Sequence, residues 1–342
     1  MTLQVLWFIL WGLLWAVYFA LDGFDLGSGM LYNFLARNDT EKRMILGSVG
    51  PVWNGNEVWL VTAGGATFAA FPGTYAAMFS FLYLPLLIIL WALIIRGVAI
   101  EFRERVDGDR WRKVWDVLAL VGSFFPALLF GVAFGNIFQG LLIDATGYHG
   151  TFFGLLNVYG VLTGLLFLAL FLHHGALWIA MRTGDDLGRR AAALSSKLWY
   201  ILLGLAVLFL AATAVYTKLY SNFLAAPGWF AVPLVAVVAL LASRLFSAQG
   251  KTLLAFSASG ATIIMVVFTG IIGLYPNLIP SSMDPAHSLT IFNSSSSALT
   301  LTVMTVVAAI FVPLIIVYQF MVYRFFRKPV TAKLLEGELE GY

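Results

Sequence analysis

Ionisable side chains inside long apolar stretches are the residues of this sequence that could carry chemistry. Asp22 and Asp25 lie three residues apart in the first stretch, and Asn54 and Glu57 lie three apart in the second. Residues three apart share one face of a helix, so each stretch is expected to present its polar groups together. A charge buried in lipid is costly, and intramembrane Asp, Glu and His residues commonly mark proton pathways. These positions are therefore the first candidates for such a pathway.

Arg96 and Glu101 follow in the third apolar stretch, toward its C-terminal end. Counted along helices at about 1.5 Å per residue, Asp25 and Glu57 lie at a similar depth near the middle of the membrane. We predict that these two carboxylates form an acidic pair or relay, reached from the cytoplasm past Arg96 and Glu101. The alternative is structural: one carboxylate pairs with Arg96 and only holds the helices together.

The histidines favour structural roles. Adjacent helix positions point about 100° apart, so His173 and His174 are not expected to ligate one metal. His149 and His287 have no evident partner in the sequence. Cysteine is absent from the chain, which excludes thiolate-ligated haem and Cys-bound iron–sulfur clusters held by this chain alone. We therefore predict no metal site and no haem-ligand set.

Composition determines the elements that must position these residues. Of the 342 residues, 61% are hydrophobic and 11% are charged, whereas soluble domains are about 45–50% apolar and about 25% charged. Lipid must therefore be part of the solvent, and helices satisfy the backbone hydrogen bonds that lipid cannot. The net charge is +3, but the basic residues gather at helix ends, so we expect no nucleic-acid partner.

Nine apolar stretches are each long enough to cross a hydrocarbon core of ~30 Å as a helix. They lie at about 3–35, 47–71, 74–100, 114–142, 151–181, 198–221, 229–245, 252–274 and 298–323. The sequence thus predicts an all-α, polytopic membrane protein with nine transmembrane helices in a single transmembrane domain, residues 1–342. Helices 1–4 (3–142) and 5–8 (151–274) follow a similar order, which suggests two four-helix bundles plus a ninth helix (298–323).

The basic residues predict how the chain is oriented. All Lys and Arg residues except Lys218 lie toward one side of the predicted helices, with the densest cluster between Arg103 and Lys113. The positive-inside rule makes that side cytoplasmic. We therefore expect the N-terminus outside and the C-terminus inside the cell.

Small and aromatic residues indicate how the helices pack. Gly23 and Gly27 form a GxxxG pair, which lets helix backbones approach closely; two further pairs are Gly131/Gly135 and Gly160/Gly164. Aromatic residues near helix ends are expected to form an interfacial belt. Examples are Trp7, Trp111 and Tyr323.

Three motifs carry a family resemblance. They are DGFDLG at 22–27, GPVWNGNEVWL at 50–60 and RGVAIEFR at 96–103. In these motifs the chain resembles subunit II of the cytochrome bd-type quinol oxidases. The first motif contains Asp22, and the second is long and unusual in composition because it combines Trp53, Asn56 and Trp59 with the polar residues noted above.

The resemblance implies a membrane quinol:O2 oxidoreductase of the bacterial cytoplasmic membrane that takes protons from the cytoplasm. Haem b and haem d, or haem b only, and the quinol would be bound by the haem-bearing subunit I. This chain would ligate no haem, would have no activity alone, and would support subunit I and line a proton route to the oxygen-reducing site. The resemblance also allows a small single-helix subunit, and lipid or quinone on this subunit.

One position departs from the family pattern. Many members have Asp where this chain has Asn54, and Asn cannot ionise. Glu57, one helical turn further on, is the candidate for the missing carboxylate.

Two other functions fit the same residues. A proton-coupled secondary transporter would also use carboxylates in mid-membrane and a repeated architecture, and discontinuous helices would favour it. A purely structural membrane scaffold is the third interpretation.

Overall fold

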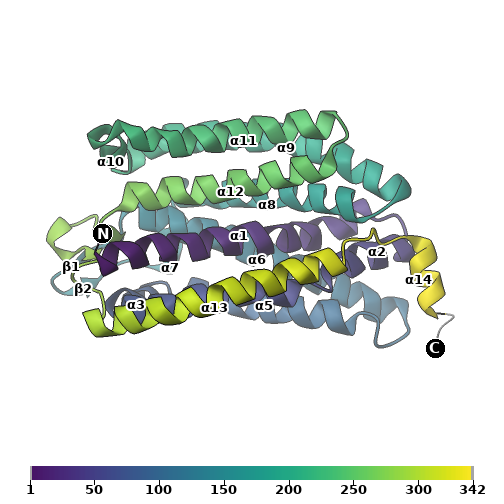
Figure 1. Ribbon diagram of the computed structural model, residues 1–342, viewed down its shortest axis with the longest axis horizontal. Coiled ribbons are helices and arrows are strands. Elements are labelled where there is room, and N and C mark those ends of the chain that lie inside the picture. Colours follow the sequence, from purple (N-terminus) through teal and green to yellow (C-terminus); the bar gives the residue numbers. More distant parts are fainter. Residues whose placement is uncertain (1, 340–342) are drawn as a thin grey trace.

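The computed structural model describes residues 2–339, with the backbone only at 185 and 336–339. Its long helices run side by side along one axis; α1 begins near one end and α14 lies at the other (Figure 1). The helices are α1 (Leu3–Leu35), α2 (Asp39–Val49), α3 (Trp53–Ala70), α4 (Pro72–Phe81), α5 (Tyr83–Phe102), α6 (Asp109–Gln139), α7 (Phe152–Leu155), α8 (Val158–Arg182), α9 (Asp185–Tyr216), α10 (Tyr220–Ala225), η1 (Pro227–Phe230), α11 (Ala231–Ala248), α12 (Thr252–Leu274), η2 (Pro285–His287), α13 (Ala298–Phe325) and α14 (Ala332–Leu339).

Strands contribute little to the fold. Two short antiparallel pairs occur in the described residues: β1 (Ile143–Asp144) with β2 (Gly147–Tyr148), and β3 (Asn277–Ile279) with β4 (Leu289–Thr290). The predicted all-α class is therefore confirmed.

Eight helical segments within residues 2–339 are long and apolar enough to cross a membrane: α1, α5, α6, α8, α9, η1 with α11, α12 and α13. This finding confirms a polytopic membrane protein. Helix α3 is not among the eight, because Asn54, Asn56 and Glu57 lower the hydropathy of its 18 residues. The predicted count of nine therefore depends on whether α3 also crosses.

Four of the predicted spans are each divided between two α-helices. The 151–181 stretch is divided between α7 and α8, and the 198–221 stretch between α9 and α10. The 47–71 stretch is divided between α2 and α3 around Pro51, where proline has no N–H to continue a helix. The 74–100 stretch is divided at Leu82 between α4 and α5. Pro85 lies in the first turn of α5, where the missing N–H is not needed. By contrast, α1 and α12 have the predicted bounds.

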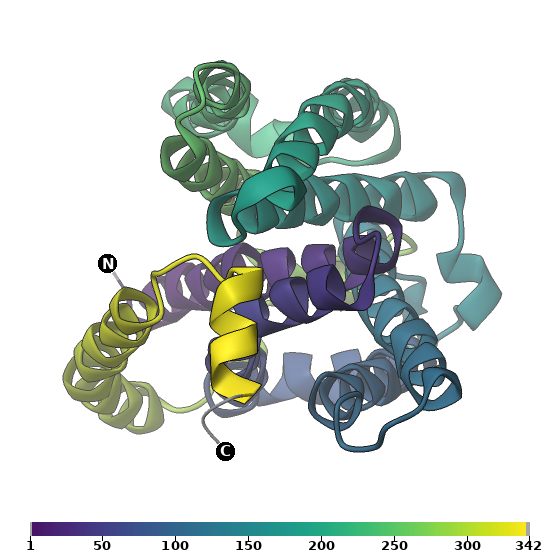
Figure 2. The ribbon, with the colours of Figure 1, turned by 90° about the vertical axis from the view of Figure 1, so that its right-hand side faces the viewer.

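The long helices form two neighbouring groups. Helix α1 packs against α3 and α6, and α5 packs against α6; in the second group α8 packs against α9 and α12, and α11 packs against α12. Contacts of α8 with α1 and α6, and of α12 with α1, join the groups; in the end-on view the second group lies above the first (Figure 2). Helix α13 lies along α1 and α3, and its one buried residue is Leu301.

Glycines allow the two groups to approach closely. A Cβ atom added at Gly27 would lie 1.9 Å from the carbonyl oxygen of Phe171 in α8. One added at Gly131 of α6 would lie 2.6 Å from the carbonyl oxygen of Thr163. Since neither position could hold a side chain, the predicted packing role of the GxxxG pairs is confirmed.

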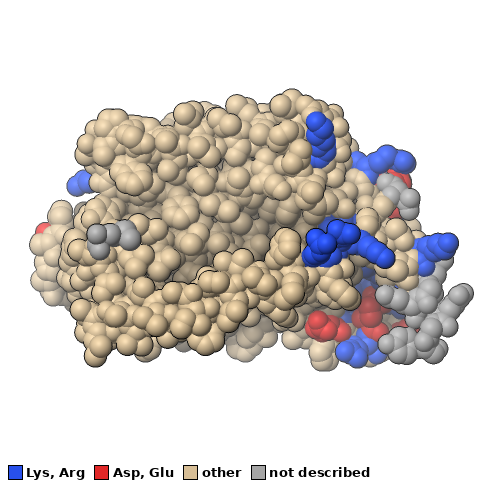
Figure 3. Space-filling model, viewed as in Figure 1, with Lys and Arg blue, Asp and Glu red and all other residues tan. Residues whose placement is uncertain are grey.

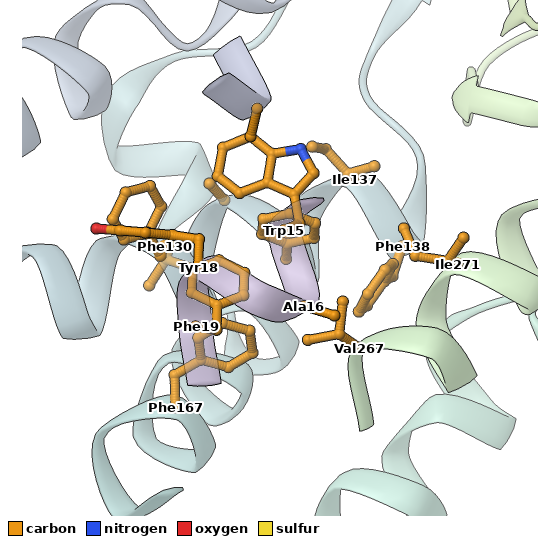
Figure 4. Packing of buried hydrophobic residues seen from close by; sticks show 14 of the residues in the cluster. Trp15, Ala16, Tyr18, Phe19, Phe130, Ile137, Phe138, Phe167, Val267 and Ile271 are labelled. Atoms are coloured by element: carbon orange, nitrogen blue, oxygen red, sulfur yellow. The ribbon is translucent and has the colours of Figure 1, made fainter. Parts of the chain in front are cut away.

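Aromatic rings fix how α1 lies against α6 and α8. Phe19 meets Phe130 and Phe167 edge to face, with ring centres 5.5 Å and 5.1 Å apart, a favourable arrangement for aromatic pairs. Trp15 meets Phe130 in the same way at 6.1 Å (Figure 4). Tyr18 belongs to the same cluster, so this packing sets the position of the polar residues one turn further along α1.

Charged side chains gather at one end of the molecule. On the face seen in Figure 3, most lie at the end formed by α2 and α14, and the surface between the two ends is uncharged. Exposed apolar side chains cover the long helices, including Leu208, Leu234 and Ile310. This distribution suits a bundle whose long sides face lipid.

Candidate functional site: a buried carboxylate–arginine cluster

Arg96 of α5 joins carboxylates from two other helices. Its Nη2 atom donates to Asp22 Oδ1 of α1 at 2.7 Å and to Glu57 Oε2 of α3 at 2.5 Å. The hydroxyl of Tyr18 donates to the second oxygen of Asp22, Oδ2, at 3.0 Å. Arg96 and Asp22 are buried, whereas the Glu57 side chain is 20% exposed. Three predicted candidates from three apolar stretches therefore meet at one guanidinium group.

Asp25 lies one turn from Asp22 and has a different partner. Its Oδ2 atom accepts a hydrogen bond from Asn56 Nδ2 at 2.7 Å, and its side chain is buried. Asn56 also donates to the carbonyl oxygen of Leu21 at 3.3 Å. The structure thus places Asp22, not Asp25, on the arginine that holds Glu57, and it ties Asp25 to α3 through an amide.

The charges of this cluster do not balance. Arg96 is the cation; Asp22 and Glu57 contact it, and Asp25 lines the same small cavity as Arg96. Full ionisation would leave two uncompensated negative charges in a low-dielectric interior, which is strongly unfavourable. The cluster can therefore hold protons, and proton exchange is the chemistry that it supports.

Two predicted candidates lie outside this hydrogen-bonded cluster. The side chains of Asn54 and Glu101 are exposed.

The two tryptophans of the second motif pack against neighbouring helices. Trp53 packs over α5, since a Cβ added at Gly97 would lie 3.0 Å from the Trp53 ring. Trp59 is buried and donates through Nε1 to Gln319 Oε1 of α13 at 2.7 Å.

Two residues of the last long helix reach the cluster, although the sequence analysis did not place either of them in the site. Gln319 Nε2 and the Tyr323 hydroxyl both donate to Asn56 Oδ1, at 3.0 Å and 2.7 Å. The prediction that Tyr323 belongs to an interfacial belt is therefore wrong, because its hydroxyl points to a residue of α3. Gln319 could have been recognised from the sequence, because it is an uncharged polar residue within a long apolar stretch.

A second ion-pair network lies nearer the charged end of the molecule. Arg103 Nε donates to Asp116 Oδ1 at 2.6 Å, and Lys42 Nζ lies 2.5 Å from Asp116 Oδ2. Tyr32 donates to Asp116 Oδ1 at 2.7 Å, and Arg103 Nη2 donates to Asp39 at 2.6 Å. This network connects α1, α2 and α6 with the end of α5, and each buried charge in it has an opposite charge beside it.

The two adjacent histidines, His173 and His174, are engaged in hydrogen bonds. Within the membrane-spanning bundle, His173 Nδ1 lies 3.1 Å from the carbonyl oxygen of Ser195, and His174 Nε2 lies 3.1 Å from that of Ala20. His174 also stacks on Phe256, with ring centres 4.3 Å apart. These imidazoles are packed among side chains, so they do not fit the role of haem ligands.

The other two histidines have partners that the sequence did not reveal. His149 lies 2.9 Å from Asp144 Oδ1, and His287 lies 3.2 Å from Asp284 Oδ2. Hydrogen bonds from Thr146 and His149 hold the pKa of the Asp144 carboxyl well below its usual range. Within residues 2–339 no group of three or more His, Cys, Asp or Glu residues could hold a metal ion.

An apolar groove of about 960 Å³ separates part of α13 from α1 and α3. Its lining is aliphatic and aromatic, with Trp7 toward one end and Gln319 and Tyr323 toward the other. Trp7 is buried and donates to the carbonyl oxygen of Leu301 at 3.2 Å, so it too is not the belt residue predicted. Hydrogen bonds at both ends of the groove thus attach α13 to the bundle.

Fold and site together define a polytopic helical membrane protein with a cluster of carboxylates around a buried arginine. The family model for cytochrome bd terminal oxidase subunit II matches residues 3–326. The chain belongs to this family. It is therefore a subunit of a bd-type quinol oxidase in a bacterial inner membrane, and membership implies a subunit I partner. The family assignment favours the oxidase interpretation over the transporter and scaffold alternatives.

Individual relatives agree over nearly the whole chain. Cytochrome bd ubiquinol oxidase subunit 2 of Bacillus subtilis is 38% identical over 97% of this chain and 98% of its own length. Cytochrome bd-I ubiquinol oxidase subunit 2 of Escherichia coli K12 is 37% identical over 92% of each chain. A chain of the bd oxidase structure from Geobacillus thermodenitrificans has the same fold, with a TM-score of 0.77, 20% identity, and coverage of 95% of this chain and 99% of that chain.

Proposed function

We propose that this chain lines a cytoplasmic proton route to the oxygen-reducing site of a quinol:O2 oxidoreductase and supports the haem-bearing subunit I. The observation that carries the proposal is that three carboxyl groups gather near one cation: Asp22 and Glu57 contact Arg96, and Asp25 lines a cavity with it. Oxygen reduction to water consumes protons. A cluster inside the membrane with more carboxyl groups than cations is suited to bind and release those protons. The proposed route comprises Asp25, Glu57 and Arg96 inside the bundle, with Asn54 and Glu101 on exposed surfaces beside it.

Haem chemistry is proposed to belong to the partner subunit. The family is haem-dependent, and haem supplies the oxygen-reducing chemistry. His173 and His174 do not fit a haem, because Ser243 packs against the free nitrogen of His173 and Phe256 stacks on the His174 ring, which leaves no room for a porphyrin beside either imidazole. We therefore propose that haem b and haem d, or haem b only, and the quinol are bound by subunit I, and that this chain alone has no oxidase activity.

The proposed topology is a single transmembrane domain with nine crossings, N-terminus outside and C-terminus cytoplasmic. Three observations support it: α3 packs beside the other helices, α1 begins at the end opposite α14, and charged side chains gather at the α14 end. A reporter fused after Lys113 should report a cytoplasmic location. An outside location there would show that the assignment of the first three crossings is wrong.

Glu57→Gln tests the route directly. The substitution preserves shape and can still accept a hydrogen bond from Arg96, but it removes the ionisable proton. We expect the assembled complex to retain its haem content and to reduce oxygen more slowly per haem, and Asp25→Asn should behave similarly. Asp107→Asn is the matched control, since that carboxylate is fully exposed in the loop after α5.

If the cluster only holds the helices together, the same variants should behave differently. Yield, haem content or association with subunit I would fall, while turnover per haem in the surviving complex would stay normal. Near wild-type turnover in a fully assembled Glu57→Gln complex would rule out an obligatory role for Glu57.

A further inference from the structure

The hydrogen bonds around Asn56 fix which way its amide points. The indole N–H of Trp59 is a donor only, so the Gln319 atom that it meets is the carbonyl oxygen, Oε1. The amide nitrogen of Gln319 then faces Asn56 Oδ1. On the other side of the Asn56 amide, the carbonyl oxygen of Leu21 can only accept, so it faces Nδ2. Both ends of the chain of hydrogen bonds require the same orientation.

All hydrogen-bonding capacity of the Asn56 amide is used in this orientation. Oδ1 accepts from Gln319 and Tyr323, and Nδ2 donates to Leu21 and to Asp25 Oδ2. An N–H donor therefore occupies Asp25 Oδ2, at 2.7 Å. A proton placed on that oxygen would meet an N–H group that cannot accept it. Oδ2 is therefore the unfavourable oxygen of Asp25 for protonation.

The other oxygen of Asp25 is free to take a proton. Oδ1 is buried and has no hydrogen-bond partner among the described residues. Three more buried polar atoms in the same region of the structure lack partners among the described residues: Ser28 Oγ, Arg96 Nε and Arg96 Nη1. Buried polar groups without partners are rare in folded proteins and commonly indicate bound water.

These groups surround a small cavity. Asp25, Ser28, Arg96 and Ser123 line it together with apolar residues of α2 such as Val49. The centre of a water molecule could move through about 10 Å³ there, close to the space that one water molecule requires. The site can offer a water an Arg N–H donor, a carboxylate acceptor and a hydroxyl, which meets the need for two to four polar partners.

From this geometry we infer a water-binding site between Asp25 and Arg96, through which Asp25 is protonated at Oδ1. The water accepts from Arg96 and donates to Oδ1. When a proton arrives on this water, an O–H bond of the resulting hydronium breaks, an O–H bond forms at Oδ1, and neutral water and a neutral carboxyl group remain. Asn56 is the positioning residue: Gln319 and Tyr323 fix its amide, and its N–H donates to Asp25 Oδ2. That oxygen therefore stays the carbonyl oxygen when Asp25 is protonated. The inference rests on the proposed proton route and specifies how Asp25 takes part in it.

Infrared difference spectra of the intact oxidase complex between acid and alkaline pH test the inference. A protonated Asp25 gives a carboxyl C=O band, which Asp25→Asn identifies by abolishing it. If Oδ2 is the carbonyl oxygen, Asn56→Leu removes its hydrogen bond and the band should shift to higher frequency. Tyr323→Phe should shift it in the same direction by less, because Asn56 keeps the donor from Gln319. Thr62→Val is the control and should leave the band in place, because the Thr62 hydroxyl bonds only the carbonyl oxygen of Val58 in its own helix.

One outcome would overturn this inference alone, and another would overturn the proposed function as well. A band that Asp25→Asn abolishes but that neither Asn56→Leu nor Tyr323→Phe moves would overturn the assignment to Oδ1 and leave the proton route standing. The absence of any Asp25 band between acid and alkaline pH would overturn both. Tyr323→Phe keeps the test decisive if Asn56→Leu does not assemble, since it removes only one hydroxyl.

The bound water has its own readout. Exchange into H2(18)O should shift an O–H stretching band of a weakly hydrogen-bonded water in the wild-type complex. Ser28→Val fills part of the cavity and replaces the hydroxyl, so this band should be lost. An isotope-sensitive band that persists unchanged in Ser28→Val, or that never appears in the wild type, would show that no such water is held there.

Discussion

The two buried ion-pair regions of this protein differ in how completely their charges are matched. Around Arg96, two carboxylates contact one cation and a third carboxyl group, Asp25, lies nearby. The Nε and Nη1 groups of that arginine have no partner among the described residues. Around Asp116, donors from Arg103, Lys42 and Tyr32 surround one carboxylate. A network in which each buried charge has an opposite charge beside it is stable in its ionised form. A network with more carboxyl groups than cations must bind protons to remain buried. We infer that the first region is functional and the second joins helix ends.

The largest expected effect is that of removing the central cation. Arg96→Gln would leave Asp22 and Glu57 without their charged partner inside the bundle, and breaking a buried pair in this way costs about 3–5 kcal/mol. We expect little assembled complex, measured as haem-containing oxidase per unit membrane. Full assembly of this variant would mean that the carboxyl groups are neutral without Arg96 and that the cluster needs no cation.

Asp116→Asn should separate stability from turnover. It weakens charge-assisted hydrogen bonds from Arg103 and Lys42, and a poorly satisfied buried group costs about 1–3 kcal/mol. We expect a lower thermal midpoint of the complex with unchanged turnover per haem. A fall in turnover comparable with that of Glu57→Gln would break the comparison, because it would place Asp116 on the proton route.

Asn54→Asp should have a small effect, and it tests whether the carboxylate at Glu57 in the region around Arg96 can be replaced by one at position 54. Asn54 lies on the surface of the bundle, outside the buried cluster, and many members of the family have Asp at this position, so the substitution should be tolerated. We expect normal assembly and turnover, and partial recovery of turnover when the change is combined with Glu57→Gln. If the double variant is no faster than Glu57→Gln alone, the two positions do not substitute for each other.

The smallest effect is expected at the protein surface near the second region. Arg37 and Asp186 form an ion pair at 3.1 Å, and their side chains are 69% and 49% exposed. Such pairs contribute little because water and salt screen them. Arg37→Ala should leave both the thermal midpoint and turnover within measurement error, and a clear loss would show that this end of α2 needs more support than its ion pairs suggest.

The sequence alone determined the architecture and the identity of most of the site. Lipid leaves a chain of this composition only helices to satisfy its backbone, so the all-α class and the bounds of α1 and α12 followed directly from apolar length. Asp22, Asp25, Glu57 and Arg96 were identifiable because a charge in an apolar stretch is costly. The polar content of the second stretch was also visible, although the break at Pro51 that separates α2 from α3 was not anticipated.

Tertiary structure decided which of these residues touch. Spacing along α1 could not say whether Asp22 or Asp25 meets Arg96, because residues three apart share a face and helix rotation selects between them. Nor could the sequence bring Gln319 and Tyr323 to Asn56, which lies more than 260 positions earlier in the chain. Those contacts depend on how α13 docks against α3. Their consequence, a fixed amide beside Asp25 and one free carboxylate oxygen, exists only once the helices are packed.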